Sequence, residues 1–124
     1  MKQITLIFLG GGLGSVARYL LSKFLSENFV STFPFGTFGV NILGCFLIGV
    51  FLTLPEKFIN FPPNLKFFLA TGFCGGFTTF SAFTYENHQL LTNHEVAYFF
   101  GYTVLSVVTG LAATYVGIIF IRNI

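Results

Sequence analysis

The sequence predicts an all-α membrane protein with four transmembrane helices. Of its 124 residues, 54% are hydrophobic and only 8% are charged, and 19 of them are phenylalanine. So few ionisable groups cannot coat a particle in water, whereas hydrocarbon requires no polar coat. The formal net charge of +2 comes from Lys and Arg residues scattered singly at segment ends. The composition therefore indicates a lipid bilayer as the surroundings and gives no indication of nucleic-acid binding.

Four apolar segments reach the length of about 20 residues that a spanning helix needs. We expect the spans at about 4–25, 35–54, 67–91 and 96–121. The connections between them contain the prolines, several asparagines and half of the charged residues, which are typical of loops. The prediction is a single four-helix transmembrane domain over residues 1–124.

Four spans would place both termini on the same side of the membrane. The basic residues on that side would be Lys2, Lys57, Lys66 and Arg122, against Arg18 and Lys23 on the other. An excess of two leans toward cytoplasmic termini, but a bias this small also permits insertion in both orientations.

The first span contains GGGLGSVARY at residues 10–19. No strand precedes this run and it lacks the Lys-Ser/Thr ending of a phosphate loop, so Gly10 and Gly14 are better interpreted as a GxxxG helix contact. Arg18 is the one charge well within an apolar segment. It either extends to the membrane interface or raises the positive potential at a pore mouth.

The second span places Asn41 at membrane depth. An unpaired amide in hydrocarbon is costly, so this side chain must face protein, water or a ligand. A hydrogen bond between helices and an amide aimed at an anion are both consistent with the sequence.

The third span holds GFCGGFTTFSAF at residues 72–83. Each of its glycines weakens a helix by about 1 kcal/mol, and its hydroxyl residues compete for backbone hydrogen bonds. We expect a break from Gly75 to Thr79, where unwound backbone would make a natural ion site. The alternative is a continuous helix in which Gly72 and Gly76 form a second GxxxG contact.

Phe80 and Phe83 follow the expected break three residues apart, on one helix face. Such a pair usually faces lipid or fills a core, but the positive edges of the rings can also attract a small anion weakly enough to release it. Glu86 then marks either the end of the third helix or a pore mouth.

The fourth span carries a stripe of residues four apart, namely Tyr102, Ser106, Gly110 and Thr114. They make either a packing face or a ladder of hydroxyl donors beside a pore. Cys45 and Cys74 are interpreted as buried free thiols. Because no nucleophile, base and orienting group occur together, we expect a protein that is not an enzyme.

Three motifs in order, residues 10–19, 36–49 and 72–83, resemble those of the small bacterial fluoride channels of the Fluc or CrcB type, over the whole chain. The resemblance implies an antiparallel, dual-topology homodimer in the bacterial cytoplasmic membrane, with two pores through which fluoride leaves the cytoplasm passively. It implies pore roles for Asn41, Phe80 and Phe83, with hydroxyls from Thr79 and Ser81.

The same resemblance implies a structural sodium ion at the centre of the dimer, held by backbone carbonyls of Gly75 and Thr78 from both subunits. Arg18 matches a vestibule arginine of that family, and we also assign Glu86 to a vestibule. Tyr102, Ser106 and Thr114 are the pore candidates of the fourth span.

Two other functions remain as alternatives. A small four-helix multidrug or cation exporter would need a carboxylate embedded in the membrane, and only Glu86, at the end of the third span, comes near that requirement. A non-transporting assembly subunit would rest on the GxxxG contacts alone.

Overall fold

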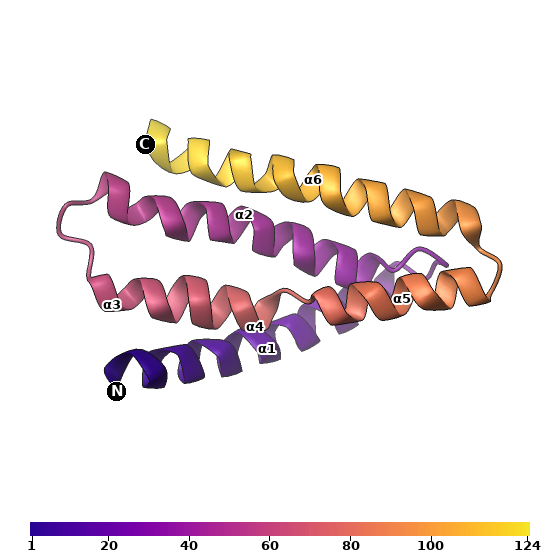
Figure 1. The fold of residues 1–124 in the computed structure, drawn as a ribbon, viewed down its shortest axis with the longest axis horizontal. Coiled ribbons are helices and arrows are strands. Elements are labelled where there is room, and N and C mark those ends of the chain that lie inside the picture. Colours follow the sequence, from indigo (N-terminus) through magenta and orange to yellow (C-terminus); the bar gives the residue numbers. More distant parts are fainter.

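Four long helical rods lie side by side in the computed structural model, which describes residues 1–124 (Figure 1). The first, second and fourth rods are α1 (Lys2–Asn28), α2 (Phe35–Lys57) and α6 (Val96–Asn123). The third rod is composed of α3 (Pro63–Lys66), the π-helical η1 (Phe67–Cys74), α4 (Gly75–Phe77) and α5 (Phe80–Thr92). All four rods are long and apolar enough to cross a membrane, so the four long apolar helices that the sequence predicted are present.

The second rod extends beyond the predicted boundary. We expected the span to end at Leu54 because proline follows it, but α2 continues through Pro55 to Lys57. A proline in the last turn removes only one helical donor, and the Phe58 N–H still closes on the Leu54 carbonyl at 3.0 Å.

Both chain termini lie at the same end of the molecule, as predicted (Figure 1). The connection from α2 to α3 is also at that end, whereas the α1–α2 and α5–α6 connections are at the other. An exposed ion pair joins Arg122 Nη2 to Glu56 Oε2 at 3.2 Å near the termini. Exposed pairs of this kind contribute little stability, so the helix contacts hold the fold together.

Glycines bring α1 against the third rod. A Cβ built on Gly10 would lie 2.9 Å from the Phe73 backbone nitrogen, and one built on Gly72 would lie 2.9 Å from the Ile7 carbonyl oxygen. A Cβ on Gly14 or Gly76 would overlap backbone carbonyls of the facing helix in the same way. The predicted Gly10/Gly14 contact is therefore confirmed. Gly72 and Gly76 make a second such contact, which we considered only for a continuous third helix, and together they bring two backbones to van der Waals distance.

Glycines also bring α2 and α6 into close backbone contact. A Cβ on Gly117 would lie 3.1 Å from the Val50 nitrogen, and one on Gly49 would lie 3.2 Å from the Ile118 nitrogen. Only 19 of the 124 residues are buried, so most apolar side chains face outward from this thin bundle. Apolar outer faces are expected where lipid or another apolar surface replaces water.

Candidate functional site

The third rod is interrupted at two residues. Thr78 and Thr79 are both extended, with φ and ψ of −85° and 157° and of −147° and 114°. We expected the break to run from Gly75 to Thr79, but Gly75 and Gly76 remain helical in α4. The glycines serve the packing on α1 instead, and the break follows them where the Thr79 hydroxyl caps α5 by accepting the Ala82 N–H at 3.1 Å.

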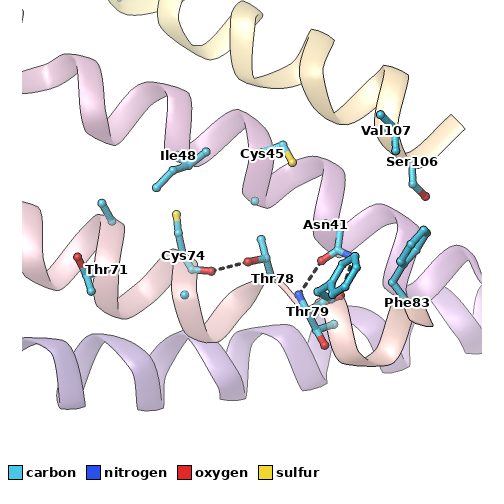
Figure 2. A pocket seen from close by; sticks show the side chains of 14 residues that line it. Asn41, Cys45, Ile48, Thr71, Cys74, Thr78, Thr79, Phe83, Ser106 and Val107 are labelled. Carbon is cyan, nitrogen blue, oxygen red and sulfur yellow. Dashed lines mark hydrogen bonds between the residues drawn. The ribbon is translucent and has the colours of Figure 1, made fainter. Parts of the chain in front are cut away.

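The side chain of Asn41, on α2, forms hydrogen bonds with the backbone at the break (Figure 2). Its Nδ2 donates to the Thr79 carbonyl at 3.0 Å, and its Oδ1 accepts the Thr79 N–H at 2.8 Å. The amide thus replaces the two helical partners that Thr79 lost. Of the two interpretations of Asn41, the hydrogen bond to protein is observed, although one of the two amide N–H groups has no partner in the chain.

The break also releases backbone carbonyls from the helical ladder. In a continuous helix, the N–H of Thr79 would donate to the Gly75 carbonyl and that of Ala82 to the Thr78 carbonyl. Instead, the Thr79 N–H donates to Asn41 Oδ1, and the Ala82 N–H donates to the Thr79 hydroxyl. Free carbonyl oxygens are ligands that a hard cation accepts, so Gly75 and Thr78 fit the predicted sodium site, which stays a prediction.

A cavity of about 530 Å³ opens beside the break (Figure 2). It lies between α2, the third rod and α6. Seven of the predicted site residues line it: Asn41, Gly75, Thr78, Thr79, Phe80, Phe83 and Ser106. The structure therefore brings together, from three rods, five of the eight residues predicted for the pore, beside the two residues predicted for the sodium site.

The two phenylalanines share a face, as their spacing predicted. Their ring centroids are 5.8 Å apart, with 30° between the ring planes. Phe80 is 77% exposed, whereas Phe83 is half-buried and packs on the Tyr102 ring at 4.9 Å. Phe83 is thus fixed by the fourth rod, and Phe80 is the more accessible of the two.

Ser106 is the member of the α6 stripe that reaches this cavity. Its Oγ is buried and has no hydrogen-bond partner in the chain. A buried hydroxyl without a partner is costly, so a ligand or water in the cavity would satisfy it. This is the one polar side-chain atom of the bundle left in that state.

The other two hydroxyl residues of the stripe make contacts elsewhere. Tyr102 is fully buried and donates to Glu86 Oε2 at 2.9 Å. The Thr114 hydroxyl donates to the Cys45 and Gly110 carbonyls at 3.0 and 3.1 Å, away from the cavity lining. The stripe is thus mainly a packing face, with Ser106 as its exception.

Glu86 joins three rods at the far end from the termini. Besides the bond from Tyr102, it accepts a short hydrogen bond from the Thr37 hydroxyl of α2. We did not single out Thr37 in the sequence. Its position four residues before Asn41, on the same helix face, is the signal that could have identified it.

Arg18 lies in a second cavity, of about 350 Å³. It is half-buried and forms no ion pair. Hydroxyl groups of Ser15, Ser22 and Ser26 share this cavity, and so does Thr79. Because Thr79 lines both cavities, the vestibule predicted for Arg18 would adjoin the break.

Ser81 lies beside the break without lining either cavity. Its hydroxyl is 3.2 Å from the Thr79 hydroxyl.

These features define a small four-span membrane protein whose third helix is broken and held by an asparagine. Residues 5–118 match the family described as CrcB-like protein, Camphor Resistance (CrcB). A protein of Flavobacterium psychrophilum named fluoride-specific ion channel FluC is 51% identical over 124 residues, covering both chains completely.

Two further proteins with the same name are similar over nearly their whole length. The one from Gloeothece citriformis is 48% identical over 123 residues, with 99% of each chain covered. The one from Leptospira interrogans is 45% identical over 122 residues, covering 98% of this chain and 96% of the relative. The chain belongs to the CrcB family.

Proposed function

We propose that this protein is a fluoride-selective ion channel, not an enzyme, through which fluoride leaves the bacterial cytoplasm passively. The relatives described above bear the name fluoride-specific ion channel, and they align with this chain from end to end. Passive exit would protect a cell in which fluoride accumulates.

The observation that carries this proposal is the donor set around the cavity at the break. Fluoride is small and strongly hydrated, so a pathway must replace its water with donors. The second N–H of Asn41 and the unpartnered Ser106 hydroxyl are such donors. The edges of Phe80 and Phe83 add a weak positive potential without a cation that would hold the ion too tightly.

The assembly proposed is an antiparallel homodimer in the cytoplasmic membrane, with two pores and a structural sodium ion between the subunits. The carbonyls of Gly75 and Thr78 would bind that ion. Gly75 supports this arrangement because a Cβ built on it has no atom within 4 Å. A glycine is unnecessary there for packing within one chain, so close approach from outside the chain would explain it.

The remaining polar residues are proposed to act beside the narrow part of the pathway. Arg18 would concentrate anions in a vestibule, because its guanidinium lies among hydroxyls and no carboxylate neutralises it. Glu86 would mark the other mouth. Ser81, Tyr102 and Thr114 would act chiefly by orienting their neighbours, since their hydroxyls are engaged with protein atoms.

An exporter is supported less well. Proton-coupled export requires a carboxylate in the substrate pathway, and Glu86 lies outside the lining of the cavity that contains Asn41. An assembly subunit would need no unpartnered donor such as Ser106.

The test is efflux of fluoride from liposomes that contain the purified full-length chain. Valinomycin and potassium balance the charge, and chloride-loaded liposomes serve as the comparison. We expect rapid fluoride release with little chloride release. No release of fluoride from correctly folded protein, or equal release of both ions, would contradict the proposal.

A further inference from the structure

Two cysteines line the cavity beside the break, from helices that face each other. Cys45 belongs to α2 and Cys74 to η1, and both are free thiols. In Figure 2 the Cys74 sulfur is directed away from its own helix toward α2. Neither thiol has a part in the fluoride chemistry proposed above, so the pair is free to bind a different ligand.

The chemistry of the lining indicates which ligand the thiols would accept. No His, Asp or Glu lines this cavity. Oxygen-seeking cations such as Mg²⁺ or Ca²⁺ would therefore find no charged ligand there, whereas thiolates select soft metals. A space of about 530 Å³ also leaves ample room for one ion between the walls.

We propose that Cys45 and Cys74 form a dithiol site for a soft, thiophilic cation, represented by Hg²⁺, and that its occupation obstructs the cavity. Each thiol releases its proton and the resulting thiolate donates an electron pair to the metal. One Hg²⁺ and two thiols thus give two sulfur–mercury bonds and two protons, with no oxidation or reduction. The binding is independent of the proposed function, whereas the obstruction rests on it.

Mercury retention tests the binding. The purified full-length chain is incubated with HgCl₂, challenged with excess glutathione as a competing monothiol, desalted and analysed for mercury per chain. We expect the wild type to retain a single mercury. Cys45→Ser and Cys74→Ser should lose it at a glutathione concentration about 100-fold lower, because one sulfur bond is gone and the chelate effect with it. Cys74→Ala provides a second variant, suited to the apolar wall.

Two results would overturn the dithiol site. One is retention of mercury by the single variants as firmly as by the wild type. The other is retention of two mercury ions by the wild type, since that stoichiometry means two independent thiols.

Fluoride efflux tests the obstruction. HgCl₂ should inhibit efflux from wild-type liposomes, dithiothreitol should restore it, and the variant lacking both thiols should be insensitive. Unchanged efflux with mercury bound would contradict the obstruction. Absence of any fluoride efflux before mercury is added would instead count against the proposed function, while the retention data would still decide the binding.

Discussion

The two halves of the third rod are held in the bundle by different means. Before the break, η1 and α4 lie against α1 through glycines, with backbone on backbone. After it, α5 is held by polar side chains, with Glu86 bonded to Thr37 and Tyr102 and with Asn87 accepting from Thr103. Glycine contacts tolerate no added atom, whereas polar ties fail when one partner is removed. The hydrogen bonds between Asn41 and Thr79 lie at the break, where the glycine-packed half ends and the half held by polar side chains begins.

Asn41→Asp should have the largest effect, on transport. A carboxylate in place of the amide loses the donor to the Thr79 carbonyl and repels an anion in the cavity. Two like charges about 4 Å apart at an effective dielectric constant of about 20 repel by roughly 4 kcal/mol. We therefore expect fluoride efflux to fall by about three orders of magnitude.

The control for this prediction is Asn87→Asp, because Asn87 is a buried asparagine that lies outside the cavity lining, whereas the half-buried Asn41 lines it. In that variant a carboxylate oxygen at position 87 would still accept the hydrogen bond from the Thr103 hydroxyl. Fluoride efflux from Asn41→Asp at the wild-type rate would show that the ion does not pass this side chain.

Gly76→Ala and Gly75→Ala should differ in stability, because Gly76 packs against α1 whereas nothing in the chain lies near the position of a Cβ on Gly75. A Cβ on Gly76 would overlap the Gly11 carbonyl oxygen, which we expect to cost about 1–3 kcal/mol of unfolding free energy. A Cβ on Gly75 meets nothing within 4 Å, so the monomer should be at least as stable as the wild type. Thermal unfolding measures both, in detergent at a dilution at which the chain is monomeric, so that dimer formation does not contribute to the unfolding temperature.

The same pair of variants sharpens the assembly proposed above. Gly75→Ala should weaken self-association, measured by the dimer fraction as detergent dilutes the protein. Equal unfolding temperatures for the two variants would contradict the glycine contact, and an unaltered dimer fraction in Gly75→Ala would contradict close approach at that residue.

Tyr102→Phe should have a smaller effect on stability. It removes one of the two donors to Glu86 but leaves the packing of the ring on Phe83. Hydrogen bonds between membrane helices contribute about 0.6 kcal/mol on average and about 1.7 at most, and we expect a loss near the upper figure because Glu86 is half-buried. Tyr115→Phe, at a 65% exposed tyrosine on the same helix, is the control. Equal stability of the two variants would show that the Glu86 bond contributes nothing.

Thr103→Val should have the smallest effect. The bond from the Thr103 hydroxyl to Asn87 Oδ1 is long, at 3.3 Å, and valine keeps the shape of the side chain. A loss of about 0.6 kcal/mol in unfolding free energy is expected. A loss larger than that of Tyr102→Phe would mean that Asn87, and not Glu86, is the main polar tie of α5.

Local patterns predicted much of this fold. The four spans, the shared side of the termini and the glycine contacts of α1 each depend on runs or spacings within one segment. The position of the break was predicted too broadly, because helix propensity ignores the packing that keeps Gly75 and Gly76 helical. The break ends where Thr79 can cap α5 and where Asn41, 38 positions away, supplies the missing partners.

The site divides in the same way. Asn41, Phe80 and Phe83 were identifiable from residue type and depth, and they do line one cavity. The bonds that tie Tyr102 and Thr114 to other helices depend on which face of α6 packs on which neighbour, and four-residue spacing does not determine that. Thr37 was missed because a single threonine near a helix start is common for reasons of capping.

The most direct measurement of the central claim, that fluoride passes the ring edges beside the break, compares Phe83→Ile and Phe80→Ile with Phe8→Ile in the liposome efflux assay. Phe8 is as exposed as Phe80, at 77%, but lies on α1 outside the cavity. We predict that fluoride efflux falls at least tenfold in the first two variants and stays at the wild-type rate in the third, with the oligomeric state unchanged in all. Wild-type efflux from both cavity variants would contradict the account.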